Sequence, residues 1–256
     1  MQHKGLASVA RQLSPKVWGN IPLRSCAALI GGNGRIANPM SLEQAAAGVL
    51  TPGGDVLNGT APATAGVSTV DRAQRIIPVT NTSLLLGFPN CNADFTQTRR
   101  WGYEVCFALA DASTHGFAAG LTSRASAGVD AFAASTVFFE AEVVTTNVSF
   151  LGFRKPEDTD VDIFYKTDGS AIPTTAATGL HTTTADTMED GVFVKLGMNS
   201  DGRNIRFFVD NAQIGDPVSL DDAYLPAEAD LLPLIAFYSN GVTTIDMSWM
   251  AFAEVN

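Results

Sequence analysis

The segment Gly191–Asp216, GVFVKLGMNSDGRNIRFFVDNAQIGD, is the clearest indicator of the fold class of this chain. Its β-branched and aromatic residues are concentrated in Phe193–Met198 and Ile205–Val209, as is typical of β-strands. Between these two runs, Asn199–Gly202 ends in Asp-Gly, a strong hairpin signal, and Asp210-Asn211 turns the chain again. The segment therefore predicts two consecutive antiparallel hairpins, and it contains no catalytic motif.

From about Val70 onward the chain keeps this strand-forming pattern. In Gly102–Leu109 the aromatic and aliphatic residues alternate with smaller or polar ones, so they share one face. Similar segments predict about eleven to thirteen strands with no amphipathic helices between them. We therefore predict an all-β fold, an antiparallel two-sheet jelly-roll sandwich. The other predicted strands are Gln74–Val79, Ser83–Leu86, Phe117–Thr122, Ala131–Val144, Val148–Arg154, Val161–Lys166, Leu231–Tyr238 and Thr243–Ala253.

Residues 1–70 lack this pattern and are predicted to form an extended N-terminal arm, with residues 71–256 as the sandwich domain. Gly and Pro interrupt the arm repeatedly, and two stretches, Leu6–Leu13 and Ser41–Ala47, suit short helices. Large apolar residues stand between the interruptions, more of them than a purely disordered segment would contain. The arm is therefore expected to bury these side chains against another surface.

Charge is unevenly distributed along the chain, whose net charge is -10. Residues 1–100 hold nine Lys and Arg against four Asp and Glu, and residues 101–256 hold seven against twenty-two. A basic arm can attract this acidic body or an acidic neighbour, unless both are simply solvated surfaces. The acidic balance argues against nucleic acid as the main partner, because phosphate binding requires clustered Lys and Arg.

The sequence contains no sign of a cofactor, a metal centre or a membrane partner. Its three cysteines are an odd number without C-x-x-C spacing, and His3, His115 and His181 lie far apart. No apolar run is long enough to span a membrane, and no signal-peptide core follows Met1–Gly5. We therefore expect no cofactor, no metal and no export by an obvious signal.

The second half of the chain resembles the concanavalin A-like sandwiches. The resemblance rests on Phe193–Asn199, on Asn204–Val209 with the turn Asp210-Asn211, and on Leu231–Phe237 and Thr243–Asp246. It extends over about residues 100–256 and depends on strand pattern, without an invariant functional residue. It implies a concanavalin A-like jelly roll behind the N-terminal arm.

A sandwich of this kind behind a basic arm also looks like the decoration, or cement, proteins of tailed-phage heads. That resemblance implies a structural virion protein without enzymatic activity, made in the host cytoplasm, which binds the outside of the capsid and stabilises it. Its partners would be the major capsid protein and copies of itself, in a homo-oligomer such as a dimer or trimer. Apolar arm residues would be buried on docking and basic ones would pair with carboxylates. These arm residues are Arg11, Lys16, Val17, Trp18, Ile21, Leu23, Arg24, Leu29, Ile30 and Arg35.

The alternative function is a carbohydrate-binding, lectin-like module such as part of an adhesin, because the same sandwich can carry a ligand on its loops or sheet. An exposed aromatic ring would then serve as a platform for sugar stacking. Trp101 follows Arg99-Arg100 at the start of a strand and is the surface candidate. Trp249 has the same parity as Ile245 and Met247, which predicts a core position.

A third hypothesis is a glycoside hydrolase that uses Glu140 and Glu142, which would share one face of a strand. Thr145 stands where the related enzymes have a further Glu, so two solvated carboxylates on an outer face are the simpler explanation. Asp158–Asp162 has the spacing of a calcium loop, but Gly169 replaces the expected bidentate Glu. Asp160 and Asp162 are therefore expected on the outward face of a strand.

Overall fold

The computed structural model describes residues 13–19, 21, 26–31, 43–45, 49–51, 56–59, 64–67, 74–77, 82–87, 93–95, 99–123, 149–155, 160–167, 184–186, 188–227, 231–239 and 244–255. Within these ranges lie one short helix, α2 (Pro15–Trp18), and seventeen strands. The strands are β1 (Cys26–Gly31), β2 (Glu43–Ala45), β3 (Val49–Thr51), β4 (Val56–Gly59), β5 (Thr64–Val67), β6 (Gln74–Ile77), β7 (Thr82–Gly87), β8 (Arg100–Leu109), β9 (His115–Ser123), β10 (Phe150–Lys155), β11 (Val161–Lys166), β12 (Thr184–Asp186), β13 (Val194–Ser200), β14 (Asn204–Val209), β15 (Ala212–Ser219), β16 (Leu231–Ser239) and β17 (Ile245–Val255).

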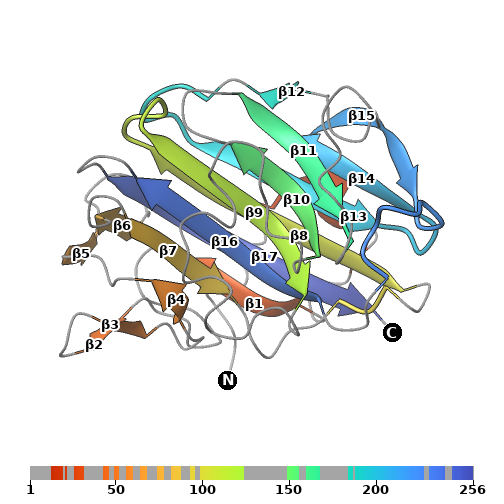
Figure 1. The fold of residues 1–256 in the computed structure, drawn as a ribbon, viewed down its shortest axis with the longest axis horizontal. Helices are drawn as coiled ribbons and strands as arrows, with labels where there is room; N and C mark the ends of the chain where they lie inside the picture. Colours follow the sequence, from red (N-terminus) through yellow and green to blue (C-terminus); the bar gives the residue numbers. More distant parts are fainter. Residues whose placement is uncertain are drawn as a thin grey trace.

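The strands form two large antiparallel sheets that lie one over the other (Figure 1). The first sheet has the order β15-β14-β13-β8-β17-β6-β5, with β1 also paired to β17. The second has the order β12-β11-β10-β9-β16-β7-β4, and β2 and β3 pair separately. This arrangement confirms the predicted all-β two-sheet sandwich. The predicted strand Ala131–Val144 lies outside the described residues.

Alternation along each strand sends one set of side chains into the space between the sheets. On β8, Tyr103, Val105, Phe107 and Leu109 are all fully buried there, as their parity predicted. The ring of Phe107 meets that of Phe117 from the second sheet edge to face, with centroids 4.9 Å apart. Interdigitated apolar side chains from both sheets therefore form the main core.

The Gly191–Asp216 segment forms the predicted hairpins. β13 pairs with β14, and β14 pairs with β15. Asp210 and Asn211 have φ values of 47° and 68°, so both central residues of the second turn are left-handed, as a two-residue hairpin of this twist requires. In the first turn Gly202 has φ 89°, and the Asp201 carboxylate accepts hydrogen bonds from the following backbone.

The structure differs from the predicted division at residue 70. β1 and β5 belong to the first sheet and β4 to the second, so much of the described chain before residue 70 is part of the sandwich. The helix predicted at Ser41–Ala47 is wrong, because β2 lies there and pairs with β3. Of Leu6–Leu13, only Leu13 is described. The partner of β1 is β17, more than 200 residues along the chain, and local sequence cannot reveal such pairing.

Trp101 and Trp249 each lie on a different face of the sheet from the one predicted. Trp101 is 1% exposed in the core, where its ring centroid lies 5.5 Å from that of Phe95. β8 begins at Arg100, which extends the inward parity of Tyr103 back to Trp101. Trp101 is therefore not a surface platform for sugars. Trp249 is buried as predicted, but a register shift after Met247 places it in the apolar cluster on the opposite face of the sheet.

Candidate functional site

A trough of small residues runs across the outer face of the first sheet. In the sheet registers, Gly197 pairs with Glu104, which pairs with Ala251 on the other side, and Gly102 pairs with Ala253. The absence of large side chains at four of these five positions leaves space directly above the backbone. The sheet can therefore receive another segment of the chain at this place.

The segment containing α2 fills that trough. Leu13, Val17, Trp18 and Ile21 are all at most 7% exposed and form an apolar cluster with Trp249 and its neighbours on the sheet. A Cβ atom added at Gly102 would lie 2.6 Å from Ile21 Cδ1 and 3.3 Å from the Trp18 ring. The arm therefore leaves no room for a large side chain at position 102, and three of the apolar arm residues predicted to bind a partner, Val17, Trp18 and Ile21, are buried on the chain's own sheet.

Side chains of the sheet also satisfy both ends of the short helix. Asn211 Oδ1 accepts the backbone N–H of Lys16 at 2.9 Å. Asn199 Nδ2 donates to the carbonyl oxygens of Lys16 and Val17, each at 3.0 Å. A helix of one turn has few internal hydrogen bonds, so these external partners hold it in place.

Glu104 lies at the bottom of the trough and is 1% exposed. Its Oε2 accepts hydrogen bonds from Trp18 Nε1 at 2.6 Å and from the backbone N–H of Ser14 at 3.0 Å. Burial raises the pKa of the Glu104 carboxyl above its usual value, against the opposing effects of these hydrogen bonds and the charge of Lys195. The docked arm therefore covers a carboxyl group that is costly to ionise.

The docking of α2 is expected to weaken as pH rises through the raised pKa of Glu104. A group with a higher pKa in the folded than in the unfolded chain contributes stability below its usual pKa, and this contribution is lost as pH rises. Glu104→Gln keeps an acceptor oxygen for Trp18 and Ser14 but cannot ionise. The urea midpoints of both proteins should converge below the usual pKa of a glutamate and diverge as pH rises above it, with the variant the more stable.

The difference between Glu104→Gln and the wild type isolates this group. Burial also raises the pKa of Asp162 and of Glu254, and both are present in the two proteins, so their titrations cancel in the difference. Parallel pH profiles for the variant and the wild type would contradict the assigned role of Glu104.

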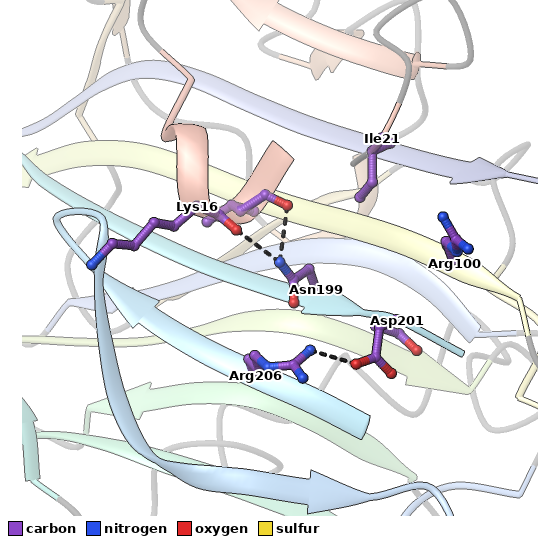
Figure 2. A pocket seen from close by; sticks show the side chains of 8 residues that line it. Lys16, Ile21, Arg100, Asn199, Asp201 and Arg206 are labelled. Carbon is purple, nitrogen blue, oxygen red and sulfur yellow. Dashed lines mark hydrogen bonds and ion pairs between the residues drawn. The ribbon is translucent and has the colours of Figure 1, made fainter. Parts of the chain in front are cut away.

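A cavity of about 300 Å³ opens between the docked segment and the first sheet. One wall is formed by arm residues, including the apolar side chains of Val17 and Ile21, and the other by polar residues of the sheet (Figure 2). In Figure 2 the ammonium end of Lys16 extends away from Arg100 and Asp201. The residues that line the cavity are Lys16, Val17, Ile21, Arg100, Asn199, Ser200, Asp201 and Arg206.

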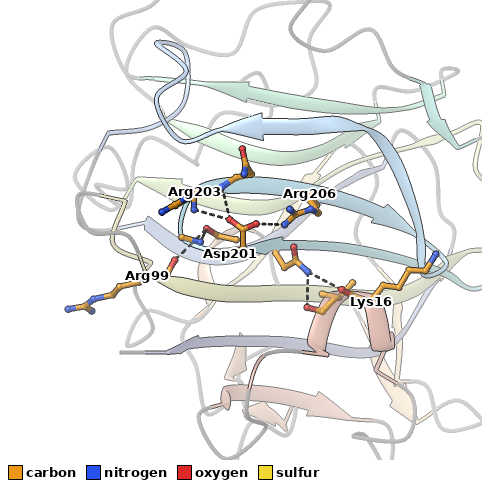
Figure 3. Close-up of polar contacts among 10 residues, drawn as sticks. Lys16, Arg99, Asp201, Arg203 and Arg206 are labelled. Atoms are coloured by element: carbon orange, nitrogen blue, oxygen red, sulfur yellow. Dashed lines mark hydrogen bonds and ion pairs between the residues drawn. The ribbon is translucent and has the colours of Figure 1, made fainter.

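Asp201 is tied firmly at the edge of this cavity (Figure 3). Its Oδ1 accepts the backbone N–H groups of Arg203 and Asn204, both at 2.9 Å, and its Oδ2 lies 2.7 Å from Arg206 Nη1. Partial desolvation raises the pKa of Asp201, but the hydrogen bonds and the Arg206 charge outweigh it and lower the pKa to about 2. Asp201 therefore stays ionised at neutral pH while both of its oxygens are engaged.

The structure places the predicted site residues in different parts of the fold. Val17, Trp18 and Ile21 come together over Glu104 and beside the cavity, and Lys16 contributes its backbone. Leu29 and Ile30 lie in β1, paired with β17. Arg11, Leu23, Arg24 and Arg35 lie outside the described residues, as do Glu140, Glu142 and Asp158.

Sequence reasoning missed Glu104, Asn199 and Asn211. Glu104 carried a usable signal, since it is the one acidic residue of Gly102–Leu109 and lies on the face where its neighbours are glycine and cysteine. Asn199 and Asn211 were interpreted as turn residues. Their side chains bond to a segment more than 180 residues away, for which the sequence offers no signal.

The structure also bears on the calcium-loop and metal-site hypotheses. Val161, Ile163 and Tyr165 face the core, while Asp160 is exposed and Asp162 half-buried, as predicted for a strand with an outward acidic face. No group of three or more His, Cys, Asp or Glu side chains suited to a metal ion occurs within the described residues. No helix in the described part of the chain is long and apolar enough to cross a membrane.

Comparison with solved structures assigns the fold. The carbohydrate recognition domain of Emp46p aligns with 13% identity over 74% of this chain and 85% of that domain, with a TM-score of 0.50. Endo-beta-1,4-glucuronan lyase from the fungus Trichoderma reesei aligns with 8% identity over 89% of this chain and 95% of the enzyme, also with a TM-score of 0.50. The chain has a concanavalin A-like jelly-roll fold.

A protein with a galectin-like fold from Bacillus subtilis also aligns, with 9% identity over 91% of this chain and 97% of that protein, and a TM-score of 0.48. No protein-family model and no curated protein sequence matches the chain. At these identities the likeness is one of fold alone, so function must be argued from the site.

Proposed function

We propose that the protein binds a saccharide, in the manner of a lectin, in the cavity between the α2 segment and strands β13 and β14. The observation behind the proposal is the cavity itself, about 300 Å³, with an apolar wall opposite hydrogen-bonding side chains. Small-molecule sites have volumes of about 300–1,000 Å³ and combine apolar surface with a few placed polar groups. A cavity at the lower end of this range suits a short saccharide.

The chemistry of the two walls supports a sugar rather than a purely apolar ligand. Arg206 offers guanidinium N–H donors to the hydroxyls of a sugar ring, and Asn199 Oδ1 is an acceptor without a hydrogen-bond partner among the described residues. Val17 and Ile21 offer aliphatic surface for the C–H groups of the ring. The fold adds weak support, since the Emp46p domain is described as a carbohydrate recognition domain.

The proposal is for binding without turnover, in line with the expectation from sequence that the protein is not an enzyme. The capsid decoration role also remains a prediction, and none of the solved structures named above is a decoration protein. If the protein does decorate a capsid, its docking contacts must differ from those predicted, because Val17, Trp18 and Ile21 are already buried within the chain.

Titration calorimetry of the purified protein against a panel of neutral and acidic oligosaccharides tests the proposal. We expect saturable binding of at least one of them, and we expect Arg206→Ala, which alters the cavity wall, to weaken it about tenfold, the loss of a charge-assisted hydrogen bond or two. Arg203→Ala is the matched control, because Arg203 lies on the same hairpin but does not line the cavity. Failure of every saccharide to bind would overturn the proposal.

A further inference from the structure

Basic side chains are concentrated around the cavity, in a chain that is acidic as a whole. Three of the 16 Lys and Arg residues line it, namely Lys16 from the arm, Arg100 at the start of β8 and Arg206 from β14 (Figure 2). Arg99 and Arg203 are close to these residues in sequence but do not line the cavity. The local charge is therefore opposite in sign to the charge of the whole protein.

Carboxylates neutralise only part of this cluster. Arg99 Nη1 lies 3.0 Å from Glu254 Oε1, and Arg206 Nη1 lies 2.7 Å from Asp201 Oδ2. Arg206 lines the cavity and has further N–H donors beyond the one that Asp201 uses. The ion pair therefore orients the guanidinium without exhausting its hydrogen-bonding capacity.

Arg100, like Lys16 and Arg203, forms no ion pair with any of the described residues. In the register of β8 and β13, Ser200 pairs with Trp101, so Asp201 follows at the Arg100 end of this strand pair. Both carboxylate oxygens of Asp201 already accept hydrogen bonds, Oδ1 from the turn backbone and Oδ2 from Arg206. In the described part of the chain Arg100 has no ion-pair partner, and its exposed side chain lines the cavity.

We infer that the cavity selects an acidic saccharide, whose anionic group is held by Arg100 together with the remaining donors of Arg206. This inference rests on the proposed saccharide binding and adds the ligand class. Arginine suits the role because its planar fork binds a carboxylate or sulfate through two hydrogen bonds. The shared chemistry is a sugar with an anionic substituent, either the carboxylate of a uronic acid or a sulfate ester.

The test compares three probes matched in length: oligomers of glucuronic acid, the corresponding oligomers of glucose, and a sulfated glucose oligomer, with inorganic sulfate alone as a fourth. Each is titrated at about 0.15 M salt, where long-range charge effects are screened. We expect an acidic oligomer to bind at least about tenfold more tightly than the neutral one. The comparison of the uronate with the sulfated oligomer then identifies which anionic group is preferred.

Two substitutions with opposite expected effects on the affinity for acidic oligomers make the test more specific. Arg100→Gln should weaken acidic binding about tenfold, whereas Asp201→Asn should strengthen it, because it removes the negative charge that competes for Arg206 while its amide oxygen still accepts the turn hydrogen bonds. Arg203→Gln is the control for net charge and should change the affinity by less than about twofold.

The outcomes separate the two proposals. Equal binding of neutral and acidic oligomers would overturn the acidic selectivity and leave saccharide binding intact, whereas no binding of any oligomer overturns both. An equal loss in Arg100→Gln and Arg203→Gln would show general charge attraction and contradict a site at Arg100. Weaker acidic binding in Asp201→Asn would likewise contradict it, because Asp201 would then be a ligand contact.

Discussion

Replacing Trp18 by alanine is expected to lower the free energy of unfolding of the isolated protein by about 3–5 kcal/mol, the usual cost of truncating a buried aromatic side chain. The indole is 5% exposed, packs over Gly102 and donates its N–H to Glu104. Its loss leaves a cavity in the trough and removes one of the two hydrogen bonds that Glu104 Oε2 accepts. Both effects lower the free energy of unfolding.

Urea unfolding at neutral pH measures this change, with Lys16→Ala as the control. Lys16 is exposed, and it bonds to the sheet through its backbone rather than its side chain, so its truncation should cost less than about 0.5 kcal/mol. Unchanged stability in Trp18→Ala would mean that the arm does not dock on its own sheet. The sequence-based prediction of docking on a partner would then regain support.

Gly102→Leu is expected to displace the arm from the trough, at a cost of about 1–3 kcal/mol from overpacking. The new side chain would need the space that Ile21 and the Trp18 ring occupy. It points away from the core between the sheets, since Gly102 lies between the inward residues Trp101 and Tyr103. The sandwich itself should therefore remain folded while one wall of the cavity is lost.

Limited trypsin digestion detects the displacement at a single bond. In the docked arm the backbone N–H and carbonyl of Lys16 are hydrogen-bonded to Asn211 and Asn199, which protects the peptide bond after Lys16. Mass spectrometry should show rapid cleavage after Lys16 in Gly102→Leu and slow cleavage in the wild type. Gly102→Ala should stay close to wild type, because the flexible end of Ile21 can move and the Trp18 ring needs to shift only slightly.

Equal protection of Lys16 in Gly102→Leu and in the wild type would contradict the fit of the arm to the glycine trough. If cleavage rises as expected, saccharide binding should fall in parallel, because Val17 and Ile21 form the apolar wall of the proposed site. A displaced arm with unchanged saccharide affinity would place the binding site elsewhere on the protein.

The sequence predicted the strands of the second half of the chain well, because each carries its own periodic pattern. Val161–Lys166 was placed to the residue, and the turns at Asp201-Gly202 and Asp210-Asn211 were correct. Errors occurred among the short strands before residue 70, whose strand character depends on their pairing partners. β1, β2 and β5 have no clear pattern of their own: β1 is a strand because it pairs with the distant β17, whereas β2 and β5 pair with the strands that follow them, β3 and β6.

The candidate site was predictable only in its apolar arm residues. Val17, Trp18 and Ile21 were expected to be buried against a surface, which is correct, but the surface is the chain's own sheet. The presence of Arg100 and Arg206 in the lining of one cavity depends on the pairing of β8 with β13, and of β13 with β14. No local pattern contains that information.

The sequence alone defined an antiparallel sandwich with strands in their correct places. It did so through the alternation of apolar and polar residues and through turn residues that accept positive φ, because these preferences act over a few residues. The glycine trough, the docked α2 and the cavity beside it required the folded chain. They arise where residues 13–21 meet strands about 80 to 240 residues away, and only the registers of β8, β13 and β17 align the small residues that leave room for the arm.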